Sequence, residues 1–267
     1  MDNLLLSAAI GDISGVPYEF SGRTKDYDAV NLLLPGNTYS DDTVCTFACA
    51  EALLEGKDMA KNLRKRCREE YHRGYGGRFY NWISAPTLEP AYGSYGNGSA
   101  MRCSSAGFLA KDEEDCIRLA TLTSLPTHNH PEGIKGAVAT ALAIHYALRG
   151  ESKEFIRQHV LNKYYPQWKE LSYADIKPDY FFDETCQRTV PAALICLLEG
   201  RDFSDVITLA ISLGGDADTL AAISAPMAYA LYRTMPQALI DNAKKKLPEW
   251  MLSLNDRFDA YVNSRKL

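Results

Sequence analysis

The stretch GGDADTLAAISAPMAYALY, residues 214–232, joins two carboxylates to a long apolar segment. Its apolar residues recur at helical spacing, which predicts a helix over residues 217–233. Gly214 stands where a glycine commonly ends a helix, here one predicted over residues 203–213. Most of the remaining sequence has the same periodicity, and alternating patterns typical of strands are scarce. Further helices are predicted over residues 4–10, 42–54, 58–71, 114–124, 132–149, 152–163, 184–198, 236–245 and 249–262.

We therefore predict an all-α fold. No internal repeat or low-complexity linker divides the sequence, so a single domain is expected over residues 1–267. The composition, with 46% hydrophobic and 24% charged residues, is that of an ordinary globular protein and excludes a disordered chain. The formal net charge of −5 provides no general basic field for nucleic acid, although a local basic patch would still permit binding.

The sequence contains seven cysteines and no Cys-x-x-Cys motif. An odd number of cysteines, several of them at helix-like apolar positions, favours reduced and buried thiols. The first residues, MDNLLL, lack the basic leader and long apolar core of a signal peptide. The longest apolar stretch, residues 220–232, is broken by Ser224 and Pro226 and is too short to span a bilayer. These features predict a cytoplasmic protein without a membrane partner.

Two acidic clusters each open a predicted apolar helix: Tyr39-Ser40-Asp41-Asp42-Thr43 and Gly214-Gly215-Asp216-Ala217-Asp218-Thr219. One interpretation is helix capping, because Ser and Asp side chains accept hydrogen bonds from free N–H groups at a helix N-terminus. The other is a site for a hard cation, Mg²⁺ or Mn²⁺. Neighbouring carboxylates repel each other without a cation between them, and oxygen ligands without Cys or His suit these ions. If the clusters converge, four carboxylates would surround one or two ions that orient a substrate and activate water.

Three other polar segments lie among the predicted helices. Gly96-Asn97-Gly98-Ser99 either allows a phosphate or ribose to approach the backbone closely or forms an ordinary turn. The adjacent Tyr95 would stack on a base or join the core. Thr127-His128-Asn129-His130 either binds a substrate hydroxyl or caps a helix, and no Cys or third His nearby supports zinc. Residues 11–20 form an irregular segment that carries Glu19 as a loop carboxylate.

The order of these motifs resembles that of the ADP-ribosylglycohydrolase family, which includes the dinitrogenase reductase-activating glycohydrolase and hydrolases of ADP-ribosylarginine and ADP-ribosylserine. The matching motifs run from Gly11 to about Tyr232: Gly-Asp-x-x-Gly-x-Pro-x-Glu-Phe, Ser-Asp-Asp-Thr, Gly-Asn-Gly-Ser-Ala-Met-Arg, Thr-His-x-His and Gly-Gly-Asp-x-Asp-Thr. The resemblance implies a compact orthogonal helical bundle with a cleft that holds two Mg²⁺ or Mn²⁺ ions. It also implies hydrolysis of the α-glycosidic bond at C1″ of the distal ribose, with ADP-ribose as the product.

The resemblance further assigns roles to residues by motif. The positions that match metal ligands are Ser40, Asp41, Asp42, Asp216, Asp218 and Thr219. The expected substrate-binding residues are Tyr95, Gly96, Asn97, Gly98, Ser99, Met101 and His128. Asp218 matches a position that tends to bridge the two ions, and Glu19 matches a glutamate on a movable loop. We expect Glu19, Asp41 and Asp218 to supply the catalytic acid or base, without assigning which residue has which role.

Departures from the family pattern leave the substrate open. Ser40 replaces the commoner Thr, and its hydroxyl can still coordinate a cation. Many relatives have a Pro shortly after Met101-Arg102, where this chain has Cys103-Ser104-Ser105-Ala106-Gly107, and the chain is shorter than many relatives. ADP-ribosylated arginine, serine, a nucleic-acid end or a small molecule are all compatible substrates. Two rival functions are an ADP-ribose-binding relative without turnover and an all-α Mg²⁺-diphosphate enzyme of isoprenoid type, although neither cluster has the Asp-Asp-x-x-Asp spacing of the latter.

Overall fold

A computed structural model describes residues 1–20 and 22–265 of the chain. Within these ranges the regular elements are helices, and the one extended pairing is an isolated bridge between Gly96 and Thr185. The predicted all-α fold is confirmed. The α-helices are α1 Leu4–Gly15, α2 Asp41–Glu55, α3 Met59–Glu69, α4 Gly77–Ser84, α5 Ser104–Leu109, α6 Glu113–Ser124, α7 Pro131–Leu148, α8 Lys153–Ile156, α9 Asn162–Tyr164, α10 Tyr173–Ile176, α11 Cys186–Glu199, α12 Phe203–Ile211, α13 Ala217–Tyr232, α14 Gln237–Lys246 and α15 Glu249–Ser264.

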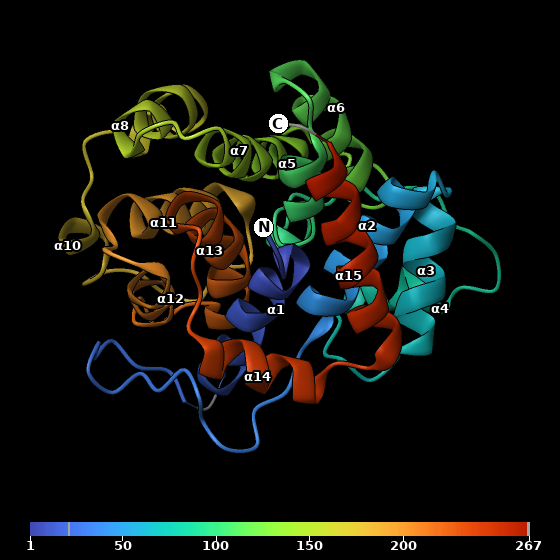
Figure 1. Cartoon of the computed structure of the whole chain (residues 1–267), viewed down its shortest axis with the longest axis horizontal. Helices are drawn as coiled ribbons and strands as arrows, with labels where there is room; N and C mark the ends of the chain where they lie inside the picture. Colours follow the sequence, from blue (N-terminus) through green and yellow to red (C-terminus); the bar gives the residue numbers. More distant parts are fainter. Residues whose placement is uncertain (21, 266–267) are drawn as a thin grey trace.

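Helices α1 and α13 pack together at the centre of the molecule (Figure 1). Every residue of α1 is buried, as expected of a helix that is apolar over most of its circumference. The close approach of the two helices depends on Gly11, because a Cβ atom there would lie 2.2 Å from the carbonyl oxygen of Ala221. The predicted helix end at Gly11 is therefore wrong: α1 continues to Gly15, and Gly11 serves packing. A 3-10 turn, Val16–Tyr18, then leads toward Glu19.

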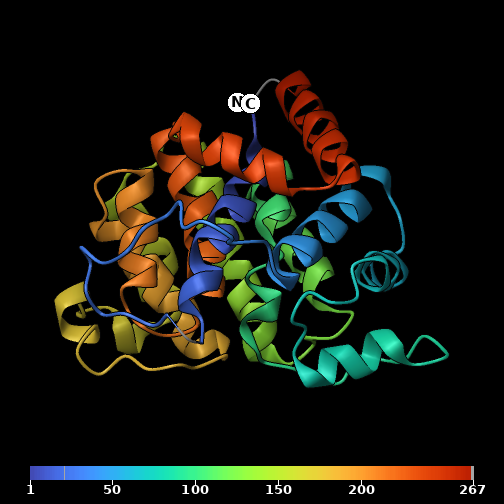
Figure 2. The ribbon, with the colours of Figure 1, turned by 90° about the horizontal axis from the view of Figure 1, so that it is seen from below.

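Helices α14 and α15 close one side of the core by packing on α1, and α15 also contacts α2. Asp259 of α15 accepts hydrogen bonds from the backbone N–H groups of Asn3 at 2.5 Å and Leu4 at 3.0 Å. These bonds satisfy free donors at the start of α1. The N-terminal ammonium of Met1 donates to Oδ1 of Asn263 at 2.6 Å, so the start of the chain lies beside the end of α15 (Figure 2). The last helix thus fixes the position of the first.

Most predicted helices are confirmed with boundaries shifted by a few residues. The helix predicted over residues 152–163 is one helical run made of α8, a π-helical stretch Arg157–Leu161, and α9. Helices α4, α5 and α10 lie outside the predicted ranges. They are only 8, 6 and 4 residues long, too short to establish an apolar periodicity.

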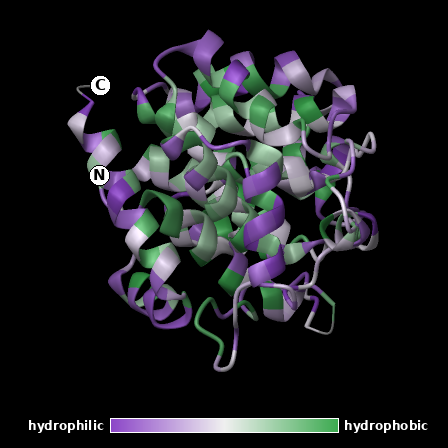
Figure 3. Ribbon diagram, turned by 90° about the vertical axis from the view of Figure 1, so that its right-hand side faces the viewer, coloured by the Kyte–Doolittle hydropathy of each residue, from purple (hydrophilic) through white to green (hydrophobic). Residues whose placement is uncertain are grey.

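Hydrophobic residues gather toward the middle of the molecule and hydrophilic residues toward its surface (Figure 3). All seven cysteines are free and buried, which confirms the expectation for the thiols. In the part of the chain that the structure describes, no helix combines the length and apolar character needed to cross a membrane.

Candidate active site

The first acidic cluster is held at the start of α2 by a carboxylate from α1. Ser40 is the N-cap of α2, and its Oγ accepts a hydrogen bond from the backbone N–H of Asp42 at 3.2 Å. Asp12 accepts hydrogen bonds from the backbone N–H of Ser40 at 2.9 Å and from its Oγ at 2.8 Å. Asp12 also accepts from the backbone N–H of Thr43 at 3.1 Å and from its hydroxyl. The capping interpretation is therefore confirmed for Ser40, while the carboxylates of Asp41 and Asp42 are not the ones that cap the helix.

The second cluster opens α13 but does not cap it in the same way. Asp216 occupies the N-cap position, and its side chain accepts no capping hydrogen bond. Instead, Oδ2 of Asp216 accepts a hydrogen bond from Nδ2 of Asn97 at 2.7 Å. Asp218 lies in the first turn and accepts from the backbone N–H of Thr219 at 2.9 Å. Simple capping thus does not explain why Asp216 stands at this helix start.

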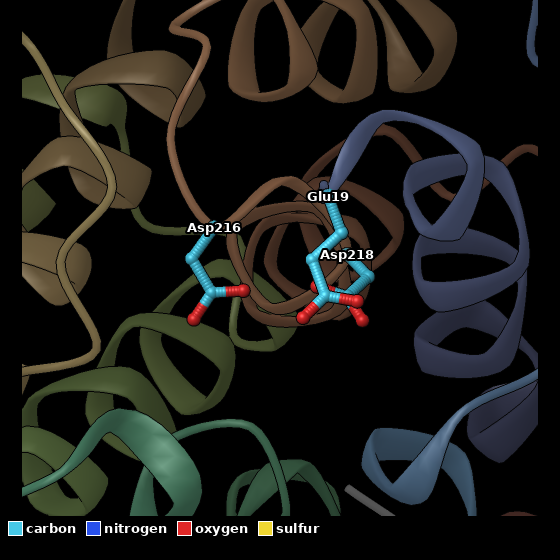
Figure 4. A group of neighbouring side chains, drawn as sticks. All are labelled: Glu19, Asp216 and Asp218. Carbon is cyan, nitrogen blue, oxygen red and sulfur yellow. The ribbon is translucent and has the colours of Figure 1, made fainter. Parts of the chain in front are cut away.

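The tertiary structure brings the two clusters together. The hydroxyl of Thr219 donates to Oδ2 of Asp42 at 3.3 Å, across 177 positions in the sequence. Carboxylate oxygens of Glu19, Asp216 and Asp218 all lie within 4.8 Å of one another. Figure 4 shows these three side chains directed into a common space, Glu19 from the segment after α1 and the two aspartates from the start of α13. The convergence that the metal interpretation requires is present.

The acidic residues lie in the wall of a cavity of about 410 Å³, a size typical of small-molecule sites. Eleven of the predicted site residues line this cavity: Glu19, Asp41, Asp42, Gly96, Asn97, Gly98, Met101, His128, Asp216, Asp218 and Thr219. The segment before α11 holds the glycine segment in place, because the backbone N–H of Asn97 donates to the carbonyl of Glu184 at 2.7 Å. The cavity therefore combines the acidic clusters with the predicted substrate segment.

Three predicted residues do not line the cavity. Tyr95 is 47% exposed and packs edge-on against the ring of His130 at 5.3 Å. Ser99 is fully buried, and its hydroxyl donates to the carbonyl of Gly133 at 2.7 Å. Ser40 borders the cluster through its bond to Asp12. The structure gives no support for the side chains of Tyr95 and Ser99 as ligand contacts, because one lies outside the cavity and the other points into the core.

Sequence reasoning gave no role to several residues of the site, among them Asp12, Glu184 and Arg78. Asp12 was overlooked because the helix was expected to end at Gly11, yet a carboxylate following the apolar run 4–10 is a sign of a buried polar role. Glu184 lines the cavity and belongs to Asp183-Glu184-Thr185 before α11, a third acidic pair beside a hydroxyl at a helix start. That repeated pattern could have identified it. Arg78, on the unpredicted α4, also lines the cavity.

Electrostatics sets this group of carboxylates apart from those on the surface. Loss of hydration raises the pKa of Asp41 to about 8, with the charges of Asp12 and Asp216 acting in the same direction. Loss of hydration, followed by the charge of Asp216, raises the pKa of Glu19 to about 7. Burial also raises the pKa values of Asp42 and Asp218 well above the ordinary range. Crowded carboxylates of this kind resist ionisation until a cation compensates them.

The donor set fits a hard divalent cation. Among residues 1–20 and 22–265, none of the cavity carboxylates forms an ion pair with Lys, Arg or His. Oδ1 of Asp42 is buried and has no hydrogen-bond partner in the described part of the chain. A buried carboxylate oxygen without a partner is costly, and an oxygen-binding cation would satisfy it. The residues that would hold such an ion are the predicted ligands Ser40, Asp41, Asp42, Asp216, Asp218 and Thr219.

Comparison with known proteins gives consistent matches over most of the chain. The family model described as ADP-ribosylglycohydrolase matches residues 3–266. The chain is 27% identical to ADP-ribosylhydrolase ARH3 of Gallus gallus, over 85% of this chain and 84% of that protein. It is also 27% identical to ADP-ribosylarginine hydrolase Tri1 of Pseudomonas putida, over 85% of this chain and 69% of that protein. A solved structure titled ADP-ribosylglycohydrolase-related protein complex superposes with a TM-score of 0.73 at 25% identity, covering 95% and 94% of the two chains.

Proposed function

Because the chain belongs to the ADP-ribosylglycohydrolase family and is an ADP-ribosylhydrolase, we propose that it cleaves the C1″ glycosidic bond of ADP-ribosylated substrates in a reaction that requires divalent cations. The observation that carries this proposal is the convergence of Glu19, Asp216 and Asp218 beside Asp42. None of these carboxylates has a basic ion-pair partner among the residues that the structure describes. We propose two Mg²⁺ or Mn²⁺ ions at this position. The reduced thiols lead us to place the protein in the cytoplasm.

In this proposal the cation supplies charge, and the protein side chains hold the cation in place. When bound, a divalent cation supplies positive charge that orients the ribose hydroxyls and lowers the pKa of water. Asp41, Asp42, Asp216 and Asp218 would hold it, with hydroxyls from Ser40 and Thr219. Asp12 keeps the start of α2 fixed through its bonds to Ser40 and Thr43. The geometry of the ligands is thus set before the substrate arrives, as catalysis by positioning requires.

Glu19 has a different position from the four aspartates. It follows the 3-10 turn after α1 and reaches the site from a separate segment, with its pKa raised to about 7 chiefly by burial. A carboxylate with a pKa near neutrality is suited to exchange protons with water or with the leaving group. We propose that the general acid and the general base are found among Glu19, Asp41 and Asp218.

The other residues of the cavity would hold the remainder of the substrate. The Gly96–Gly98 segment offers backbone that a diphosphate or ribose can approach, and Arg78 offers the positive charge that suits phosphate oxygens. Met101 and Tyr92 add apolar surface to the same cavity. This arrangement of acidic, glycine-rich and basic elements suits one ligand with a ribose and a diphosphate.

The first test is calorimetric titration of ADP-ribose into the protein with Mg²⁺ and again with EDTA. We expect binding that is lost in EDTA and lost in Asp218→Asn. Asp241→Asn, an exposed carboxylate on α14, is the matched control and should bind as the wild type does. Absence of binding in both conditions would contradict the proposal.

The second test measures turnover on a panel of ADP-ribosylated arginine and serine peptides, nucleic-acid ends and small molecules. Release of ADP-ribose that stops in EDTA and resumes with Mg²⁺ or Mn²⁺ would identify the linkage and the cation. Binding without release on every substrate would favour the rival function, an ADP-ribose-binding relative. The isoprenoid alternative has no support from the family match or from the related structures.

A further inference from the structure

Arg102 is the largest fully buried side chain among the described residues, and it lines the cavity. Its Nε donates to the carbonyl of Thr123 at 3.0 Å, and one terminal nitrogen lies 3.4 Å from the carbonyl of Ser124. The same nitrogen, Nη2, donates to the hydroxyl of Thr127 at 2.8 Å. Burying a charged guanidinium costs free energy unless hydrogen bonds compensate for the lost hydration, so these hydrogen bonds are expected to be important for the structure around it. None of the acidic cluster residues is among its partners in the described structure.

The hydroxyl of Thr127 connects Arg102 to His128. A guanidinium has only donors, so the Thr127 oxygen accepts from Arg102. Among the described residues the oxygen forms one further hydrogen bond, with Nδ1 of His128 at 2.7 Å, and the hydroxyl of Tyr92 is a second polar neighbour. A hydroxyl has a single proton, and this ring nitrogen is the acceptor that lies within hydrogen-bond distance of it. The arrangement therefore directs the Thr127 proton to Nδ1 of His128.

A neutral imidazole that accepts at Nδ1 carries its proton on Nε2. Burial, together with the charges of Arg102 and Arg78, lowers the pKa of His128 well below its ordinary value, so the ring is neutral. The Nε2 edge lies along the glycine segment: a Cβ atom on Gly98 would be 3.0 Å from this nitrogen, and one on Gly96 would be 3.5 Å from it. The protonated nitrogen is thus at the cavity wall.

We propose that Arg102, acting through Thr127, fixes His128 as the tautomer that carries its proton on Nε2, so that the ring donates a hydrogen bond to an acceptor oxygen of the ADP-ribosyl group. The choice of ligand rests on the proposed function; the fixed tautomer does not. Arg102 and Thr127 are positioning residues. His128 favours a ligand that places an acceptor atom beside its Nε2. The absence of side chains at Gly96 and Gly98 leaves room for the ligand to reach this donor.

The tautomer is measured directly by long-range ¹H–¹⁵N correlation spectra of the histidine rings, with the His128 signals assigned by their loss in His128→Gln. We expect a pyridine-type Nδ1 and a pyrrole-type Nε2 in the wild type. Thr127→Val keeps the shape and removes the donor, so the other tautomer should become populated. Thr127→Ser restores the hydroxyl and should restore the wild-type spectrum. A wild-type ring protonated on Nδ1, or an unchanged spectrum in Thr127→Val, would overturn the proposal.

Binding and turnover provide the second readout. We expect the Kd for ADP-ribose and the KM to rise about three- to tenfold in Thr127→Val, the range expected for one hydrogen bond, with kcat less affected. Thr127→Ser should remain close to the wild type. An altered tautomer with unchanged affinity would refute the contact to the ligand. Failure of the wild type to bind ADP-ribose would refute the proposed function, while the spectra would still decide the tautomer.

Discussion

Nδ2 of Asn97 donates a hydrogen bond of 2.7 Å to Oδ2 of Asp216, although the two residues are 119 positions apart. The same nitrogen donates to the hydroxyl of Thr189 on α11 at 3.1 Å. Asn97 therefore connects the glycine segment, the start of α13 and a third helix. A ligand that displaces the glycine segment must also disturb Asp216, so the substrate side and the acidic side of the cavity are mechanically linked.

Replacing Asn97 with Asp tests this connection. The variant has nearly the same shape, but it removes the donor and places a carboxylate against Asp216, where like charges repel. We expect turnover to fall at least about tenfold, the effect of losing a hydrogen bond to a charged group. Steady-state kinetics on the substrate found in the panel measures this change. Asn81→Asp, at an exposed position of α4, is the control and should retain wild-type turnover.

Asp12→Asn tests whether the carboxylate on α1 organises the start of α2. The amide oxygen can accept, but its NH₂ group meets donors from Ser40 and Thr43 instead of acceptors. We expect the free energy of unfolding to fall by about 1–3 kcal/mol, as for a buried donor left unsatisfied. Urea denaturation measures the loss. Wild-type stability in this variant would show that Asp12 does not hold the two segments together.

Gly11→Ala tests the packing of α1 on α13. The added Cβ atom would lie 2.2 Å from the carbonyl oxygen of Ala221, and neither backbone can move without disturbing the core. We expect destabilisation of about 3 kcal/mol or more, at the upper end for overpacking. Gly77→Ala, at a helical position with no atom within 4 Å of the new Cβ, should change stability by less than about 1 kcal/mol. Thermal unfolding of the two variants side by side provides the measurement.

Glu51→Gln tests a pH-dependent contribution to stability away from the cavity. Burial acts to raise the pKa of Glu51, but hydrogen bonds from Arg66, Lys57 and Asn62 outweigh it and lower the pKa to about 2. The pKa in the folded state is thus below the ordinary value of 4.5, so the stabilisation is complete above pH 4.5 and is lost as pH falls through about 2. The Tm of the wild type should exceed that of the variant at neutral pH, and the difference should shrink toward pH 2. A difference independent of pH would contradict the assignment.

The fold class was predictable because most helices have long apolar patterns that agree with their burial. Helix α13 shows this clearly: its apolar run follows a glycine and an acidic start, and the structure buries residues 217–230. The end of α1 was not predictable, because Gly11 terminates a helix or permits close packing depending on its neighbour. Only the position of Ala221 makes packing the outcome.

The candidate site shows the same division. The acidic residues and the glycine segment could be named from local motifs, since each motif lies at a helix start or a turn. Asp12 was missed because the helix was expected to end at Gly11, and its role depends on contacts with Ser40. The acidic pattern around Glu184 is visible in the sequence, but only the tertiary structure places this residue beside the backbone of Asn97. Ser99 was assigned to the ligand, although its hydroxyl bonds to the carbonyl of Gly133 in the core.

The sequence by itself determined most of the helices, the acidic clusters and the identity of the groups that could hold a cation, because these follow from local periodicity and residue chemistry. The tertiary structure decided that Thr219 meets Asp42, that Asp12 holds Ser40 and that the hydroxyl of Thr127 lies against Nδ1 of His128. Such contacts join distant segments or depend on how a buried ring is oriented. The first two arise from the packing of α1, α2 and α13 against one another, which no local pattern specifies.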